Sequence, residues 1–87
     1  MTWFVYLLEC VNGKIYTGIT TDVTRRFDEH LKGIGAKFTR ANPPLHILAV
    51  KLCMNRSEAS SMEYYIKRLK PSQKKELAVI WNEQNGQ

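Results

Sequence analysis

The fold is decided by residues 3–20, which read WFVYLLECVNGKIYTGIT. Aromatic and branched side chains fill the first part of this stretch, which is typical of a buried strand. Asn12-Gly13 predicts a turn, because both residue types tolerate a positive φ angle. Residues 14–20 return as a second strand, so the stretch predicts an antiparallel β-hairpin.

The register of this hairpin decides whether Tyr6 and Tyr16 can act together, because side chains alternate between the faces of a sheet. With a two-residue turn, Tyr16 lies opposite Glu9 and Tyr6 falls on the other face. With a three-residue turn, Tyr6 pairs with Gly18 and both hydroxyls share one face. Asn-Gly alone favours the first register. We predict the second, because it gathers a core of aliphatic side chains on the opposite face, namely Val5, Leu7, Ile15 and Ile19.

Three helices and one further strand are predicted after the hairpin. Asp22, Ser57 and Pro71 mark where the helices begin. The expected elements are a helix over 22–32, a loop over 33–44, a strand over 45–53, and helices over 57–70 and 72–83. The order β-β-α-β-α-α predicts a small α+β fold, a three-stranded antiparallel sheet flanked by helices. We expect residues 1–87 to form one domain, because two domains of half this length would each lack a core.

The composition favours a polyanionic partner. The 87 residues include 13 Lys and Arg against 8 Asp and Glu, a net charge of +5. A basic surface attracts nucleic acid, although surplus lysines on an ordinary globular protein give the same total.

Neither the cysteines nor the first residues indicate secretion. Cys10 and Cys53 lie in apolar segments and form no C-x-x-C pair, so we expect buried thiols, with a single disulfide as the alternative. Residues 1–9 lack the basic region and the cleavage site of a signal peptide. Their apolar run is shorter than the ~20 residues of a membrane span. We therefore expect a cytoplasmic protein that does not enter the membrane.

Several side chains could carry chemistry. Arg26 and His30 are four residues apart and share a helix face, where a guanidinium could bind phosphate. The alternative is a solvated face with an Arg25–Glu29 ion pair. Glu63, on the flank of an apolar stripe, is either an oxygen ligand for Mg²⁺ or Mn²⁺ or the ion-pair partner of Lys67.

Two further features could contact a nucleic acid. Gly18 has no side chain and leaves room beside the tyrosines for substrate backbone or water. Phe38, between Lys37 and Arg40, could stack on a base beside phosphate contacts.

Taken together and in this order, these residues resemble the GIY-YIG endonuclease domain. The resemblance is strongest to its short, stand-alone, UPF0213-like bacterial members. The resemblance covers about residues 3–70. Its motifs are Phe4-Val5-Tyr6, Tyr16-Thr17-Gly18, the helix from Thr20 to His30, Gly33-Ile34-Gly35-Ala36-Lys37-Phe38-Thr39-Arg40, and Ser57-Glu58-Ala59 followed by Met62 to Leu69. Phe4 replaces the glycine of the first signature and Thr17 the isoleucine of the second, and neither of those positions supplies a catalytic group.

The resemblance implies a metal-dependent endonuclease with Tyr6, Tyr16, Arg26, His30 and Glu63 as its catalytic residues. Tyr6 or Tyr16 would be the general base toward water, which requires a nearby cation to lower a phenol pKa of about 10. Arg26 would stabilise charge on the phosphate, and His30 would hold the water or the phosphate. Glu63 would bind one divalent ion, Mg²⁺ or Mn²⁺, on the leaving-group side.

Gly18 and the side chains of Arg25, Lys37, Phe38 and Arg40 would contact the nucleic acid. The implied substrate is DNA rather than RNA, as in DNA repair, and branched, nicked and single-stranded forms are all open. The family's catalytic domain is often joined to a targeting module, so we expect a protein partner to supply targeting here. A nucleic-acid-binding module of the same fold with little turnover is the alternative, and a basic scaffold domain is a third.

Overall fold

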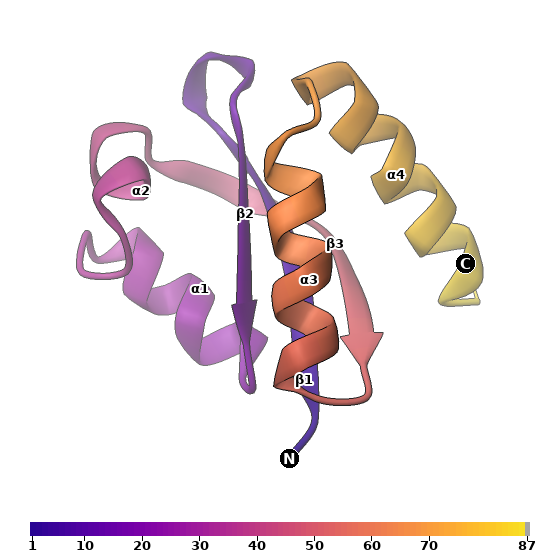
Figure 1. The fold of residues 1–87 in the computed structure, drawn as a ribbon. Helices are drawn as coiled ribbons and strands as arrows, with labels where there is room; N and C mark the ends of the chain where they lie inside the picture. The colour runs from indigo at the N-terminus through magenta and orange to yellow at the C-terminus, as the bar shows by residue number, and fades with distance from the viewer. Residues whose placement is uncertain (87) are drawn as a thin grey trace.

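The computed structural model describes residues 1–86 and contains one three-stranded antiparallel sheet with helices on both sides (Figure 1). The strands are β1 (Trp3–Cys10), β2 (Ile15–Thr20) and β3 (Pro44–Cys53), in the spatial order β2-β1-β3. The helices are α1 (Val23–Leu31), α2 (Lys37–Ala41), α3 (Arg56–Lys67) and α4 (Pro71–Gln84), with a 3₁₀ turn, η1, over Val11–Gly13. The predicted α+β class and antiparallel sheet are confirmed.

The hairpin adopts the three-residue register. Tyr6 pairs with Gly18 and Leu8 with Tyr16, as expected when η1 supplies all three turn residues. Asn12 and Gly13 have φ angles of 64° and 72°, so the Asn-Gly pair supplies the positive φ values but does not form a two-residue turn. The packing of the apolar face, rather than the turn dipeptide, selects the register.

The two faces of the sheet bury different clusters. One face carries Val5, Leu7 and Ile15 and packs against Ala59 and Ile66 of α3, together with Ala78 and Trp81 of α4. The other face carries Tyr6, Leu8 and Cys10, with Tyr16, Val23 and Phe27 packed against them. Figure 1 shows α1 and α2 on one side of the sheet and α3 and α4 on the other. The tyrosines therefore belong to the α1 side of the sheet, whereas Glu63 belongs to α3 on the other side.

Two predicted elements need correction. The expected loop over residues 33–44 contains a short helix, α2, which begins without a side-chain cap at Ala36. The second long helix begins at Arg56 rather than Ser57, because Asn55 is its N-cap and accepts a hydrogen bond from the Glu58 amide. Asp22 caps α1 as predicted.

Cys10 and Cys53 are buried free thiols, so the disulfide alternative does not hold. Within residues 1–86, no helix is both long and apolar enough to cross a membrane.

Candidate active site

A hydrogen-bonded chain runs from β1 through α1 to α2. Tyr6 Oη lies 2.8 Å from His30 Nε2, and His30 Nδ1 lies 2.7 Å from Thr39 Oγ1. Thr39 donates its hydroxyl proton to the Ala36 carbonyl at 3.1 Å, so Thr39 Oγ1 accepts from His30 Nδ1–H. His30 Nε2 is then the acceptor, and the Tyr6 hydroxyl is the donor.

The protonation states of this chain follow from burial. Burial, and next the charge of Arg26, lower the pKa of His30 below its usual 6.5, so the imidazole is neutral at pH 7. Burial, and next the neighbouring Tyr16, raise the pKa of Tyr6 above its usual value. Arg26 opposes that rise and Glu63 adds to it, so both charges act on the Tyr6 hydroxyl. Tyr6 is therefore a fixed, protonated hydrogen-bond donor.

Tyr16 occupies a different position beside the same chain. Its ring centroid lies 5.0 Å from that of His30, 6.2 Å from that of Tyr6 and 5.7 Å from that of Phe38. Thr17 Oγ1 is the only fully buried side-chain oxygen or nitrogen without a hydrogen-bond partner in residues 1–86. The Tyr16 hydroxyl also has no hydrogen-bond partner among the described residues, and Tyr16 is half-buried. Since this hydroxyl is not fully buried as that of Thr17 is, it is open to solvent.

Arg26 is anchored on α1 with donors to spare. Its Nη1 lies 2.9 Å from Glu29 Oε1 and its Nη2 donates to the Gly35 carbonyl at 2.8 Å. The expected alternative, an ion pair from Arg25 to Glu29, is wrong, because Arg26 takes that partner. A guanidinium has five N–H donors, so N–H groups of Arg26 remain for a phosphate.

Glu63 lies on α3, and its charge makes the smallest contribution to the raised pKa of Tyr6. Its side chain is 23% exposed, and Oε2 lies 3.3 Å from Lys67 Nζ. Within residues 1–86, no three His, Cys, Asp or Glu side chains cluster as a metal site. A single accessible carboxylate still fits Mg²⁺ or Mn²⁺, which keep several waters and bind through one or two carboxylates plus substrate phosphate.

Two glycines are spacers for this arrangement. A Cβ on Gly18 would lie 2.4 Å from Tyr6 Oη, and one on Gly35 would lie 2.4 Å from His30 Nδ1. We expected open space for substrate beside Gly18, but the Tyr6 phenol fills it. The structure thus gives Gly18 a packing role.

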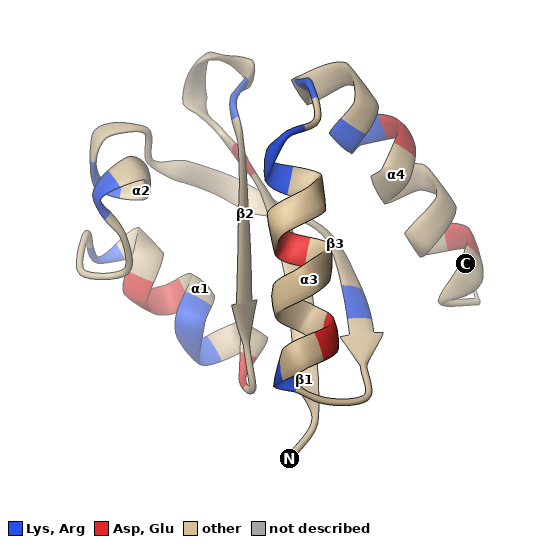
Figure 2. Ribbon diagram, viewed as in Figure 1, with Lys and Arg blue, Asp and Glu red and all other residues tan. Residues whose placement is uncertain are grey.

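The residues predicted to contact nucleic acid differ in their distance from the tyrosines and in what they pack against. Phe38 packs beside Tyr16, whereas the side chains of Arg25, Lys37 and Arg40 are exposed on α1 and α2. Figure 2 shows basic residues on α2 and on the C-terminal end of α3, on either side of β2. Sequence reasoning gave no role to Thr39, although it lies in the motif Gly33–Arg40, which could have drawn attention to it.

Comparison with known proteins identifies the family of the chain. The sequence matches the GIY-YIG catalytic domain over residues 2–76. The chain belongs to the GIY-YIG family. Membership indicates a nuclease-type function with a nucleic-acid substrate, and GIY-YIG nucleases generally use a divalent metal.

Relatives of similar size support the assignment. A UPF0213 protein of Cupriavidus necator is 53% identical over 73 residues, which cover 84% of this GIY-YIG chain and 79% of the relative. A UPF0213 protein of Desulfotalea psychrophila is 46% identical over 76 residues, which cover 86% and 69%. The solution NMR structure of UPF0213 protein BH0048 from Bacillus halodurans has a TM-score of 0.57 at 41% identity, covering 92% of this chain and 85% of that one.

The close approach at Gly18 gives a direct test of the tyrosine–histidine chain. Gly18→Ala is expected to lower the free energy of unfolding by about 1–3 kcal/mol, because the buried Tyr6 ring cannot move away without losing His30. Thermal unfolding measures the change. In the double variant Tyr6→Leu/Gly18→Ala the extra loss from the alanine should disappear, whereas fully additive losses would contradict the predicted clash.

Proposed function

We propose that this protein is a metal-dependent endonuclease that hydrolyses phosphodiester bonds in DNA. The observation that carries the proposal is that five side chains of the required chemistry come from four neighbouring elements. Tyr6 and Tyr16 come from β1 and β2, Arg26 and His30 from α1, and Glu63 from α3, near enough for its charge to add to the rise of the Tyr6 pKa. A binding module requires basic residues but has no need of this combination.

In the proposed mechanism, Tyr16 is the general base. Its hydroxyl faces solvent and, as the phenolate, can take a proton from the attacking water. Tyr6 donates to His30 and is held protonated, so it positions the water or the phosphate instead. The water oxygen bonds to phosphorus, the bond from phosphorus to the 3′ oxygen breaks, and the products are a 5′ phosphate and a 3′ hydroxyl.

Arg26 and Glu63 would act on the phosphate. The remaining N–H groups of Arg26 would stabilise the charge that grows on the non-bridging oxygens in the transition state. Glu63 would hold one Mg²⁺ or Mn²⁺, which when bound polarises the phosphate and eases departure of the leaving oxygen. DNA rather than RNA as substrate, and a protein partner that supplies targeting, belong to the same proposal.

A plasmid-nicking assay tests this function. Supercoiled plasmid should be nicked with Mg²⁺ or Mn²⁺ and left intact when chelator removes the ion, because the phosphate would lose its electrophilic partner. The competing binding module predicts salt-sensitive plasmid binding with no nicking at any metal concentration. A scaffold domain predicts neither, and both of those outcomes would refute the endonuclease.

A further inference from the structure

A pocket of about 320 Å³ opens beside Tyr16, the proposed base, and extends to Lys74, which has no part in the chemistry described above. It is lined by Ile15, Tyr16, Thr17, Phe38, Lys67 and Lys74. These residues come from β2, α2, α3 and α4, so the pocket crosses the β2 edge. Its size is at the lower end of small-ligand sites, roughly 300–1,000 Å³.

Lys74 is an unusual residue for such a wall. It is only 8% exposed, and within residues 1–86 no carboxylate lies within ion-pair distance of it. Its Nζ donates to the Ile15 carbonyl at 3.3 Å. Burial, and next the charge of Lys67, lower the pKa of Lys74. A buried cation without a counter-charge destabilises a fold, so its position favours binding of an anion.

The other polar groups of the pocket also suit an anion. Lys67 lies at the end of α3 and reaches Glu63, which places the pocket next to the proposed metal ligand. Thr17 has a buried hydroxyl without a hydrogen-bond partner in the described chain. Figure 2 shows the basic end of α3 facing β2 across from α2. Two lysines thus line a pocket beside Tyr16, the proposed base.

An aromatic pair forms the rest of the wall. The Phe38 and Tyr16 rings have centroids 5.7 Å apart and planes 33° apart, and the Phe38 side chain is 37% exposed. Cationic groups that follow a phosphate backbone, beside aromatic rings that stack on bases, are the typical composition of single-strand binding sites. A base inside a duplex is paired and stacked, and would have to leave its stack to reach Phe38.

We propose that this pocket is a nucleotide subsite, in which Lys67 and Lys74 bind the phosphate next to the scissile one and Phe38 stacks on its unpaired base. The substrate class is then DNA with a single-stranded segment at the cleavage point. The inference rests on the proposed function for the nature of the polyanion and for which phosphate is scissile, whereas binding of an unpaired nucleotide in the pocket does not depend on cleavage.

Binding without cleavage tests the subsite. In chelator, a short fluorescein-labelled single-stranded oligodeoxynucleotide should bind about tenfold more tightly than its duplex, since only the unpaired base can stack. Lys74→Met should weaken single-strand binding about tenfold and reduce the salt slope by about 1. The matched control is Lys75→Met, which removes the same charge from an exposed position on α4 and should change binding less than about twofold.

Stability separates ligand binding from a structural role of Lys74. Methionine keeps the apolar stem and removes an unpaired buried charge, so Lys74→Met should unfold at a temperature no lower than the native protein. If Lys74→Met unfolds at a lower temperature but binds the single strand as the native protein does, then Lys74 has a structural role and the subsite is overturned. Equal weakening by Lys74→Met and Lys75→Met would also overturn it, because nonspecific charge would then explain binding.

A separate variant tests the stacking of the nucleotide base on Phe38. Phe38→Ala should weaken binding of the single strand about tenfold and leave the duplex unchanged. An equal effect on both would refute stacking in this pocket. Since all of these measurements are made without metal, failure of plasmid nicking with the binding results intact would reject the endonuclease and keep the subsite.

Discussion

Glu63→Gln is expected to abolish metal-dependent nicking while leaving the fold intact. Glutamine keeps the shape of the side chain but removes the charge that would hold Mg²⁺ or Mn²⁺. Metal polarisation of a phosphate supplies several kcal/mol, so the single-turnover rate should fall about a thousandfold. The ion pair from the half-buried Glu63 to the exposed Lys67 is an i,i+4 helix pair, which contributes only about 0.3–0.5 kcal/mol, so thermal unfolding should change little.

The control for this variant is Glu76→Gln, which removes an exposed carboxylate from α4 and should keep native activity. Titration with Mn²⁺, followed by its effect on water proton relaxation, gives a readout independent of cleavage. Glu63→Gln should weaken Mn²⁺ binding and Glu76→Gln should not. Nicking by Glu63→Gln at more than a tenth of the native rate, with Mn²⁺ affinity unchanged, would remove Glu63 from the metal site.

Tyr16→Phe is expected to reduce the rate constant for cleavage far more than Tyr6→Phe. Loss of a general base typically lowers the rate by about 10²–10⁴. Tyr6 is a poor base because its hydroxyl already donates to His30 and burial raises its pKa. Its loss should cost about tenfold, through looser positioning rather than through proton transfer.

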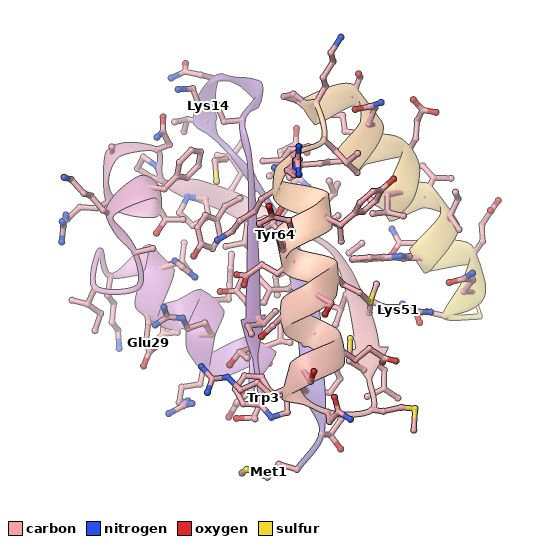
Figure 3. All side chains as sticks on the ribbon, in the orientation of Figure 1. Met1, Trp3, Lys14, Glu29, Lys51 and Tyr64 are labelled. Atoms are coloured by element: carbon pink, nitrogen blue, oxygen red, sulfur yellow. The ribbon has the colours of Figure 1, made fainter. Side chains whose placement is uncertain are left out.

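Single-turnover rates with enzyme in excess separate this chemical step from binding. Tyr64→Phe is the matched control, because the substitution removes the same hydroxyl from a residue that lies on α3 (Figure 3), is 69% exposed and is not part of the chain from Tyr6 through His30 to Thr39. It should cleave at the native rate. A larger loss in Tyr6→Phe than in Tyr16→Phe would exchange the roles of the two tyrosines in the mechanism.

The strands and the long helices could be predicted from the sequence because each has a strong local pattern. The hairpin register is the instructive case, since Asn12-Gly13 favours one answer and the aliphatic face the other. The aliphatic face is decisive because a shift by one residue would turn Val5 and Leu7 away from α3. The same register brings Tyr6 and Tyr16 to one face.

What the sequence could not reveal depends on contacts between distant segments. The five residues of α2 are too few for an apolar period, and the hydrogen bond from His30 to Thr39 helps to hold this helix in place. Arg26 pairs with Glu29 because its guanidinium also reaches Gly35, a contact outside α1. Lys74 was not singled out from the sequence, although it lies on the same helix stripe as Ala78 and Trp81, the buried side of α4, whereas its neighbour Lys75 is exposed.

The last helix, α4, donates hydrogen bonds to both edge strands of the sheet. From α4, Lys74 donates to the Ile15 carbonyl of β2. Asn82 and Asn85, at the other end of the same segment, donate to the Leu48 and Val50 carbonyls of β3. β2 and β3 are the two edge strands, and an edge strand with free carbonyls invites pairing with another molecule. One helix thus occupies carbonyl groups on both edge strands that would otherwise be open to pairing with a strand of another molecule.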